Sequence, residues 1–108
     1  MTEPLSGLAL RRAVCEALGW QLTNLDNGEI YPAEWIPAYE SDAKLSEALL
    51  DEKCREKGWI WHIKSCAIGE FDCWLLDLST GIEVATASSK DPSEARMRAL
   101  LMALRSQK

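Results

Sequence analysis

The chain has 108 residues, of which 47% are hydrophobic, and a net charge of −5. That length suits one domain and leaves no room for two, and the apolar content excludes a disordered chain. The acidic balance argues against direct nucleic-acid binding, because phosphate backbones require a basic surface.

The first predicted element is a helix over about Leu5–Leu18. Leu10 and Val14 recur there at helical spacing, which is typical of a helix with one buried face. A turn-rich stretch follows, in which Pro32 and Pro37 forbid a continuous helix. This stretch has no strong periodic pattern, so we predict a loop.

A second helix is expected to begin near Ser41 and to end at about Lys57. Ser41 is a good N-cap residue, and Asp42 would favour the positive end of the helix dipole. Gly58 supplies a stop signal. The apolar residues of this helix fall on two edges, so one edge could pack on the core while the other meets another helix or a second copy of the chain.

Three strands are expected next: Trp59–Lys64, Phe71–Leu78 and Ile82–Ala87. The connections between them are too short for parallel crossovers, so the sheet should be an antiparallel meander. The segment Phe71–Leu78 is apolar on both sides, which is typical of a central strand whose two faces are covered. We therefore expect helices on both faces of the sheet.

The last helix has the clearest start signal. Asp91 is placed as its N-cap, Pro92 as its first residue and Glu94 as the third, an aspartate variant of the capping box. A compact apolar stripe follows, formed by Met97, Leu100, Leu101 and Leu104.

The predicted fold is α+β, a three-stranded antiparallel meander sandwiched by amphipathic helices, in the order α-loop-α-β-β-β-α. The whole chain, residues 1–108, is expected to form this single domain.

Catalytic and metal-binding signatures are weak. His62 is the only histidine, and its position on the polar side of a strand favours a surface role over catalysis. A zinc site of His62, Cys66 and Cys73 is conceivable, but the paired close ligands of structural zinc sites are missing. A disulfide between Cys66 and Cys73 is similarly disfavoured, and the four cysteines are expected to be reduced. We expect no enzymatic activity, no metal and no cofactor.

Aromatic and acidic residues gather in the stretch around residues 20–42. Between Asp26 and Glu52 the chain carries eight acidic residues against Lys44 alone. Tryptophan and tyrosine dominate binding hot spots, so this stretch is a candidate partner-binding surface. Its proposed contact residues are Trp20, Tyr31, Glu34, Trp35, Tyr39, Glu40 and Asp42. An alternative contact face comprises Arg98, Met102 and Arg105 on the last helix, although a solvated surface is the favoured interpretation of these residues.

Several fragments together resemble the phage ABA sandwich domain, a family of small phage and prophage proteins with a layered helix–sheet–helix fold. The fragments are residues 13–20 (AVCEALGW), 37–42 (PAYESD), 58–59 (GW) and 87–95 (ASSKDPSEA). The resemblance covers nearly the whole chain and lapses between Trp20 and Pro37. It implies a phage or prophage origin and action in the bacterial host cytoplasm, and it assigns no functional residue.

The leading functional hypothesis is a small non-enzymatic phage accessory protein that binds a host or phage protein. Its most plausible role is inhibition of a host defence component, as in anti-CRISPR-like inhibitors, and a homodimer is possible. The first alternative is a binder of a nucleotide signal, in which Arg96, Arg98 or Arg105 would meet phosphate. The second is an assembly or structural accessory protein of the virion. No apolar run approaches the roughly 18 residues of a membrane span, and the acidic start of the chain lacks the basic leader of a secretory signal. A cytoplasmic protein with no membrane contact is therefore expected.

Overall fold

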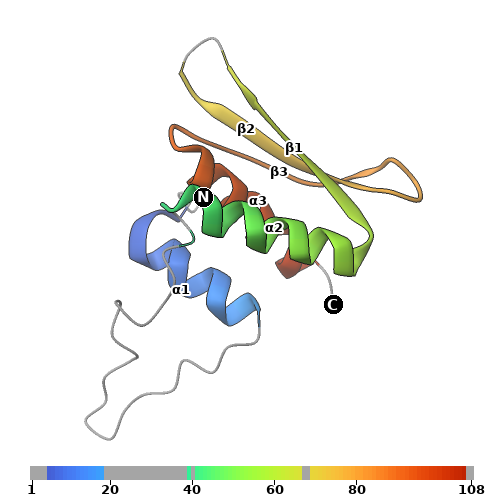
Figure 1. The fold of residues 1–108 in the computed structure, drawn as a ribbon, viewed down its shortest axis with the longest axis horizontal. Helices are drawn as coiled ribbons and strands as arrows, with labels where there is room; N and C mark the ends of the chain where they lie inside the picture. Colours follow the sequence, from blue (N-terminus) through green and yellow to red (C-terminus); the bar gives the residue numbers. More distant parts are fainter. Residues whose placement is uncertain (1–4, 19–38, 40, 67–68, 107–108) are drawn as a thin grey trace, which may run out of the picture.

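The protein is described by a computed structural model covering residues 5–18, 39, 41–66 and 69–106. Its elements are α1 (Gly7–Ala17), α2 (Ala43–Lys57), β1 (Trp59–Ser65), β2 (Phe71–Asp77), β3 (Glu83–Ser89) and α3 (Pro92–Ser106) (Figure 1). The predicted class and element order are confirmed, and each predicted bound lies within about two residues of the observed one. Within these residues, no helix is long and apolar enough to cross a membrane.

The sheet is an antiparallel meander with strand order β1-β2-β3. β1 and β2 pair without interruption from Trp59 opposite Asp77 to Ser65 opposite Phe71. β2 and β3 pair less regularly, because the register shifts between Leu75 and Leu76. This shift makes Val84 the extra residue of a bulge in β3, a feature that increases local twist.

One face of the sheet carries the core. Trp59, Cys73, Leu75 and Ala85 alternate along the three strands and are buried on this face. α3 packs against β2 and β3, α2 packs against β1, and α1 packs against α3. The layers are therefore the sheet, then α2 with α3, then α1 (Figure 1).

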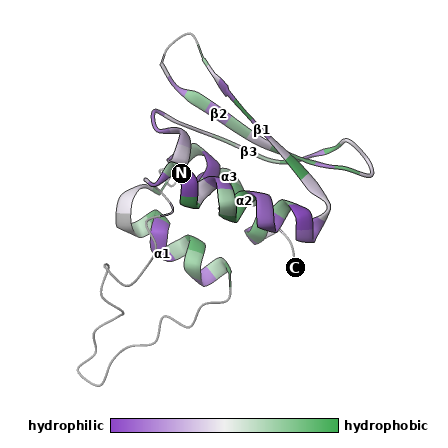
Figure 2. Cartoon of the chain, viewed as in Figure 1, coloured by the Kyte–Doolittle hydropathy of each residue, from purple (hydrophilic) through white to green (hydrophobic). Residues whose placement is uncertain are grey.

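The expectation of helices on both faces of the sheet is not met by the described residues. Both helices that contact the strands belong to the core face, and Figure 2 shows hydrophobic and hydrophilic residues mixed along all three strands. The apolar residues on the other side of β2, Trp74 and Leu76, led to the expectation. They are only partly buried, because they lie among strand neighbours and under no described helix.

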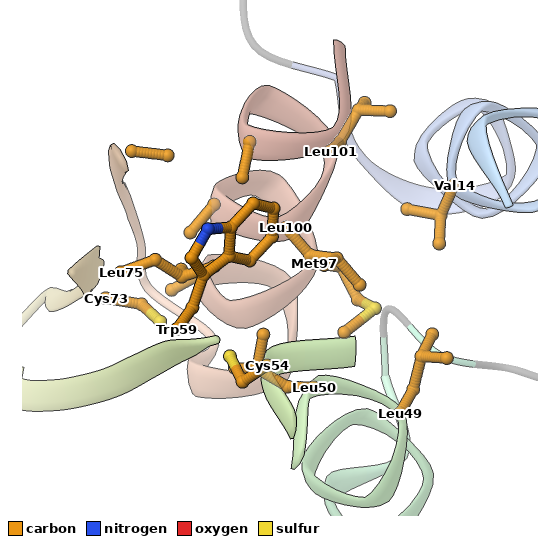
Figure 3. Packing of buried hydrophobic residues seen from close by; sticks show 14 of the residues in the cluster. Val14, Leu49, Leu50, Cys54, Trp59, Cys73, Leu75, Met97, Leu100 and Leu101 are labelled. Carbon is orange, nitrogen blue, oxygen red and sulfur yellow. The ribbon is translucent and has the colours of Figure 1, made fainter. Parts of the chain in front are cut away.

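α3 is the most buried helix. Met97, Leu100 and Leu101 of the predicted stripe are buried, as expected. A second row, Ala95, Ala99 and Ala103, is fully buried as well, because α3 contacts the sheet, α2 and α1. Sequence analysis missed this row because alanine contributes little to an apolar pattern. Figure 3 shows Trp59 and Leu100 among the residues of the core cluster that unites these elements.

The helix ends follow local capping chemistry. The N-cap of α2 is Asp42, one residue after the expected Ser41, and its Oδ1 accepts a hydrogen bond from the Leu45 N–H at 3.0 Å. α2 ends at Lys57 as predicted, and Gly58 follows as its C-cap with a left-handed φ of 74°.

The N-terminus of α3 departs from a simple capping box. Asp91 Oδ1 accepts from the Ser93 N–H at 2.8 Å, as predicted. The Asp91 N–H donates to the Ser89 hydroxyl at 3.2 Å, and that hydroxyl donates to Glu94 at 2.9 Å. Ser89 therefore stands between the two groups that a capping box joins directly. As a result, the last residue of β3 is bonded to the first turn of the next helix.

Replacing Gly58 with alanine should lower the free energy of unfolding by about 1 kcal/mol, because only glycine adopts a left-handed conformation at no steric cost. An added Cβ meets no atom within 4 Å, so the effect is purely conformational. Gly58→Asn is the matched control and should lose less, since asparagine tolerates this conformation. Urea denaturation measures both variants, and equal losses would contradict the conformational explanation.

Candidate functional site

Only some of the residues predicted to bind a partner lie within the part of the chain that the structure describes. Trp20, Tyr31, Glu34, Trp35 and Glu40 lie outside the described residues. Tyr39 is partly buried and packs against the core cluster. Its pKa is raised by burial and, to a lesser degree, by Cys15 on α1 and Glu52 on α2, which places the phenol near both helices. Asp42 is exposed and caps α2. These two residues therefore already have roles within the fold.

The residues of the alternative contact face on α3 differ in how far they are exposed. The Arg98 guanidinium donates to the Leu5 carbonyl at 2.8 Å and to the Ser88 carbonyl at 2.6 Å. It also forms an ion pair with Glu94 at 2.7 Å, and only 18% of its side chain is exposed. Arg98 thus ties α3 to the end of β3 and to Leu5, two residues before α1. Met102 and Arg105, in contrast, are exposed.

Arg96 is a buried structural residue that sequence analysis assigned only to a possible phosphate site. It is 7% exposed, and its guanidinium donates to the Ser46 hydroxyl at 3.1 Å and to Glu47 at 3.1 Å. Its guanidinium carbon lies 5.5 Å from the centre of the Trp61 ring, which fits a cation–π contact. The signal that could have revealed this role is its position one turn before Leu100, within the buried side of α3.

A hydrogen bond from α2 also fixes the same indole. The Trp61 Nε1–H donates to Asp51 on α2 at 2.7 Å. Trp61 is therefore held between a carboxylate of α2 and a guanidinium of α3. Because Arg96 and Arg98 both have internal partners, they are poorly placed to bind the phosphate of a nucleotide.

The second side of the sheet forms an open face, which we define as the outward residues of the three strands. They are Ile60, His62 and Lys64 from β1, Asp72, Trp74 and Leu76 from β2, and Thr86 and Ser88 from β3. At its centre the His62 and Trp74 rings stack, with centroids 5.8 Å apart and an interplanar angle of 24°. Ile60 beside them is 41% exposed. The open face thus combines an aromatic pair with exposed aliphatic surface.

One end of the open face carries a short hydrogen-bonded group. Asp72 accepts from the Cys66 thiol at 2.9 Å and from the Ser88 hydroxyl at 2.6 Å. These bonds lower the pKa of Asp72, and the bond to Asp72 raises the pKa of Cys66. The carboxylate is therefore held ionised and the thiol protonated, which is the wrong direction for a thiolate nucleophile.

The arrangement does not support the zinc set. His62 lies on the open face, whereas Cys73 is buried on the core face, so the two side chains cannot ligate one ion. No group of three potential metal ligands occurs in the described part of the chain. None of the four cysteines, all of which lie in the described ranges, forms a disulfide. Burial raises the pKa of Cys54 to about 11 and that of Cys73 to about 12, so both are protonated at neutral pH.

The chain matches no family model, no curated protein and no solved structure.

Arg96→Lys should lower the free energy of unfolding by about 2 kcal/mol. Lysine cannot bond Ser46 and Glu47 together while it also covers the Trp61 ring. The loss should come mainly from Ser46 and Trp61, because the Glu47 side chain is 51% exposed and its ion pair is screened. Arg105→Lys at an exposed position is the control, with an expected change below about 0.5 kcal/mol. Equal urea midpoints for the two variants would refute the network.

A thiol-reactive reagent should modify one cysteine of the native protein and all four after unfolding in guanidinium. Cys15, Cys54 and Cys73 are buried, whereas Cys66 is partly accessible. Cys66→Ser retains a hydroxyl that can donate to Asp72 and should abolish the native reaction. Two or more native equivalents in a colorimetric thiol assay would contradict this placement.

Proposed function

We propose that this protein is a non-enzymatic binding protein that contacts another protein through the open face of its sheet. The observation that carries the proposal is the stacked His62–Trp74 pair beside exposed Ile60, on a face that no described helix covers. Exposed apolar groups surrounded by polar ones are typical of protein-interaction surfaces.

The chemistry of this face suits a protein partner. Trp74 offers a large rigid surface that can be buried at a low entropy cost, because it is already fixed by its strand and by His62. Lys64, Asp72 and Ser88 at one end provide polar groups that could form the rim of such an interface.

The partner that we favour is a component of a bacterial defence system, and the protein would act as its inhibitor in the host cytoplasm. This proposal rests on the resemblance to the phage ABA sandwich domain and on the acidic balance of the chain. Glu52 is an exposed acid on α2, the helix that packs against β1 on the core face. Glu47 and Asp51 are exposed on the same helix, although they also bond Arg96 and Trp61. A basic nucleic-acid-binding surface on the partner would be attracted by these groups.

The test is affinity capture from a bacterial host lysate with the wild-type protein and two matched variants. His62→Glu places a charge at the centre of the open face and should weaken binding at least about tenfold, because that charge would lose its water at an apolar contact. Met102→Glu places the same charge on an exposed position of α3, outside the sheet, and should leave binding unchanged.

The amount of each captured protein is measured by mass spectrometry, and the affinity for the purified partner by calorimetry. A partner lost with Met102→Glu and kept with His62→Glu would move the contact to α3. The proposed function fails if the wild type captures no protein. It also fails if His62→Glu still captures every protein that the wild type captures.

A further inference from the structure

The two edges of the sheet differ in how they are protected. β3 carries a bulge at Val84, and Arg98 donates a hydrogen bond to the carbonyl of Ser88 near its end. β1 is the opposite edge, and its seven residues run in unbroken register with β2. Bulges, prolines and charged residues are the usual protection of an edge strand. β1 has no proline, and its one charged residue is Lys64. The open edge of this sheet is therefore β1.

The backbone groups on this open edge can be identified from the pairing. The Leu78 N–H donates to the Gly58 carbonyl at 2.9 Å, so Gly58 directs its hydrogen-bonding groups toward β2. Because these groups alternate in direction along an antiparallel strand, the N–H and C=O groups of Trp59, Trp61 and Ile63 point to the free edge. They form a regular row that could pair with a further strand.

A hollow of about 380 Å³ lies along the same edge. It is lined by Trp59, Ile60 and Trp61 from β1 and by Asp51, Cys54 and Arg55 from α2. Ile60 points to the open face while its two neighbours point to the core face, so a hollow that touches all three lies at the edge of the strand. Asp51 and Arg55 stand one helical turn apart beside it. This edge thus presents an acid and a base next to exposed apolar surface.

We propose that β1 pairs in antiparallel orientation with β1 of a second copy of this chain, with the two-fold axis at Ile60. The two sheets would then join into one sheet of six strands. Trp59 would exchange backbone hydrogen bonds with Trp61 of the partner subunit, and the two Ile60 side chains would meet on the open face. Asp51 would face Arg55 of the partner subunit, and the reverse pair would form by symmetry, as an isologous interface requires.

Charge selects this register over the next one. A strand advances about 3.3 Å per residue and a helix about 1.5 Å, so moving the axis from Ile60 to His62 moves the facing point on α2 by about four residues. Asp51 would then face Glu47 of the partner subunit, which places acid against acid. The register centred on Ile60 instead pairs each Asp51 with an arginine. In this register Trp59 and Trp61 form the backbone bonds, while Ile63 lies beyond the paired segment because the position opposite it is the end of α2 in the other copy. Charge is therefore what favours a second copy in this register.

The mass of the purified protein in solution tests the proposal. At about 100 µM we expect a dimer that dissociates on dilution, because the interface consists of one strand pair and its flanking side chains. Ile60→Glu would bring two carboxylates together at the axis and should give a monomer. Ile82→Glu is the control, since Ile82 is an exposed isoleucine at the β2–β3 turn and should leave the dimer intact. A wild-type monomer at this concentration, or a dimer that survives Ile60→Glu, overturns the proposal.

A charge exchange tests the register. Arg55→Glu and Asp51→Lys should each raise the dissociation constant of the dimer about tenfold, because each places like charges across the interface twice. Mixing the two variants in equal amounts should restore a heterodimer with nearly wild-type affinity, since both opposite-charge pairs re-form between unlike copies. Circular dichroism of each variant checks that the fold survives, because Asp51→Lys also loses the bond to Trp61. Failure of the mixture to associate, with both variants folded, overturns the register. These measurements use the purified chain alone, so their outcome is independent of any host partner.

Discussion

The guanidinium of Arg96 lies where three elements of this protein meet. It bonds Ser46 and Glu47 on α2, covers the Trp61 ring on β1 and is carried by α3. Burying this charge is costly, and the polar groups of α2 and the face of an indole offset that cost. Since the bonds are directional, they fix the rotation of α2 relative to α3 more strictly than apolar packing alone would. The covered face of the sheet depends on that fixed pair of helices.

Local signals explain why much of the fold could be predicted. Gly58 ends α2 and Asp91 begins α3, because a left-handed glycine and an N-cap aspartate act within a few residues of themselves. The alternation in β1 likewise reports the two faces of a strand. The choice between Ser41 and Asp42 as N-cap was wrong by one residue, since both side chains are capable and the backbone conformation decides.

The wrong predictions concern residues whose neighbours in the fold cannot be read from the sequence pattern. Trp74 and Leu76 show that the outer side of β2 is apolar, and the sequence does not tell whether a helix, another protein or solvent lies above it. Arg96 looked like an exposed cation because its partners on α2 are some 50 residues away in the chain. For the predicted partner-binding surface the outcome is of another kind. Tyr39 is packed against the core, and most of the other residues of that surface lie outside the described part of the chain.

The position of α1 has a consequence for the order in which the protein comes apart. The sheet and α3 are connected through neighbours in sequence, and Ser89 bonds β3 directly to the first turn of α3. α1 instead reaches its main packing partner, α3, across most of the chain. Loop-closure entropy makes such a distant contact slow to form, and a peripheral layer is the first to open. α1 should therefore exchange its amide hydrogens fastest among the helices and detach while the sheet, α2 and α3 remain folded as one cooperative unit.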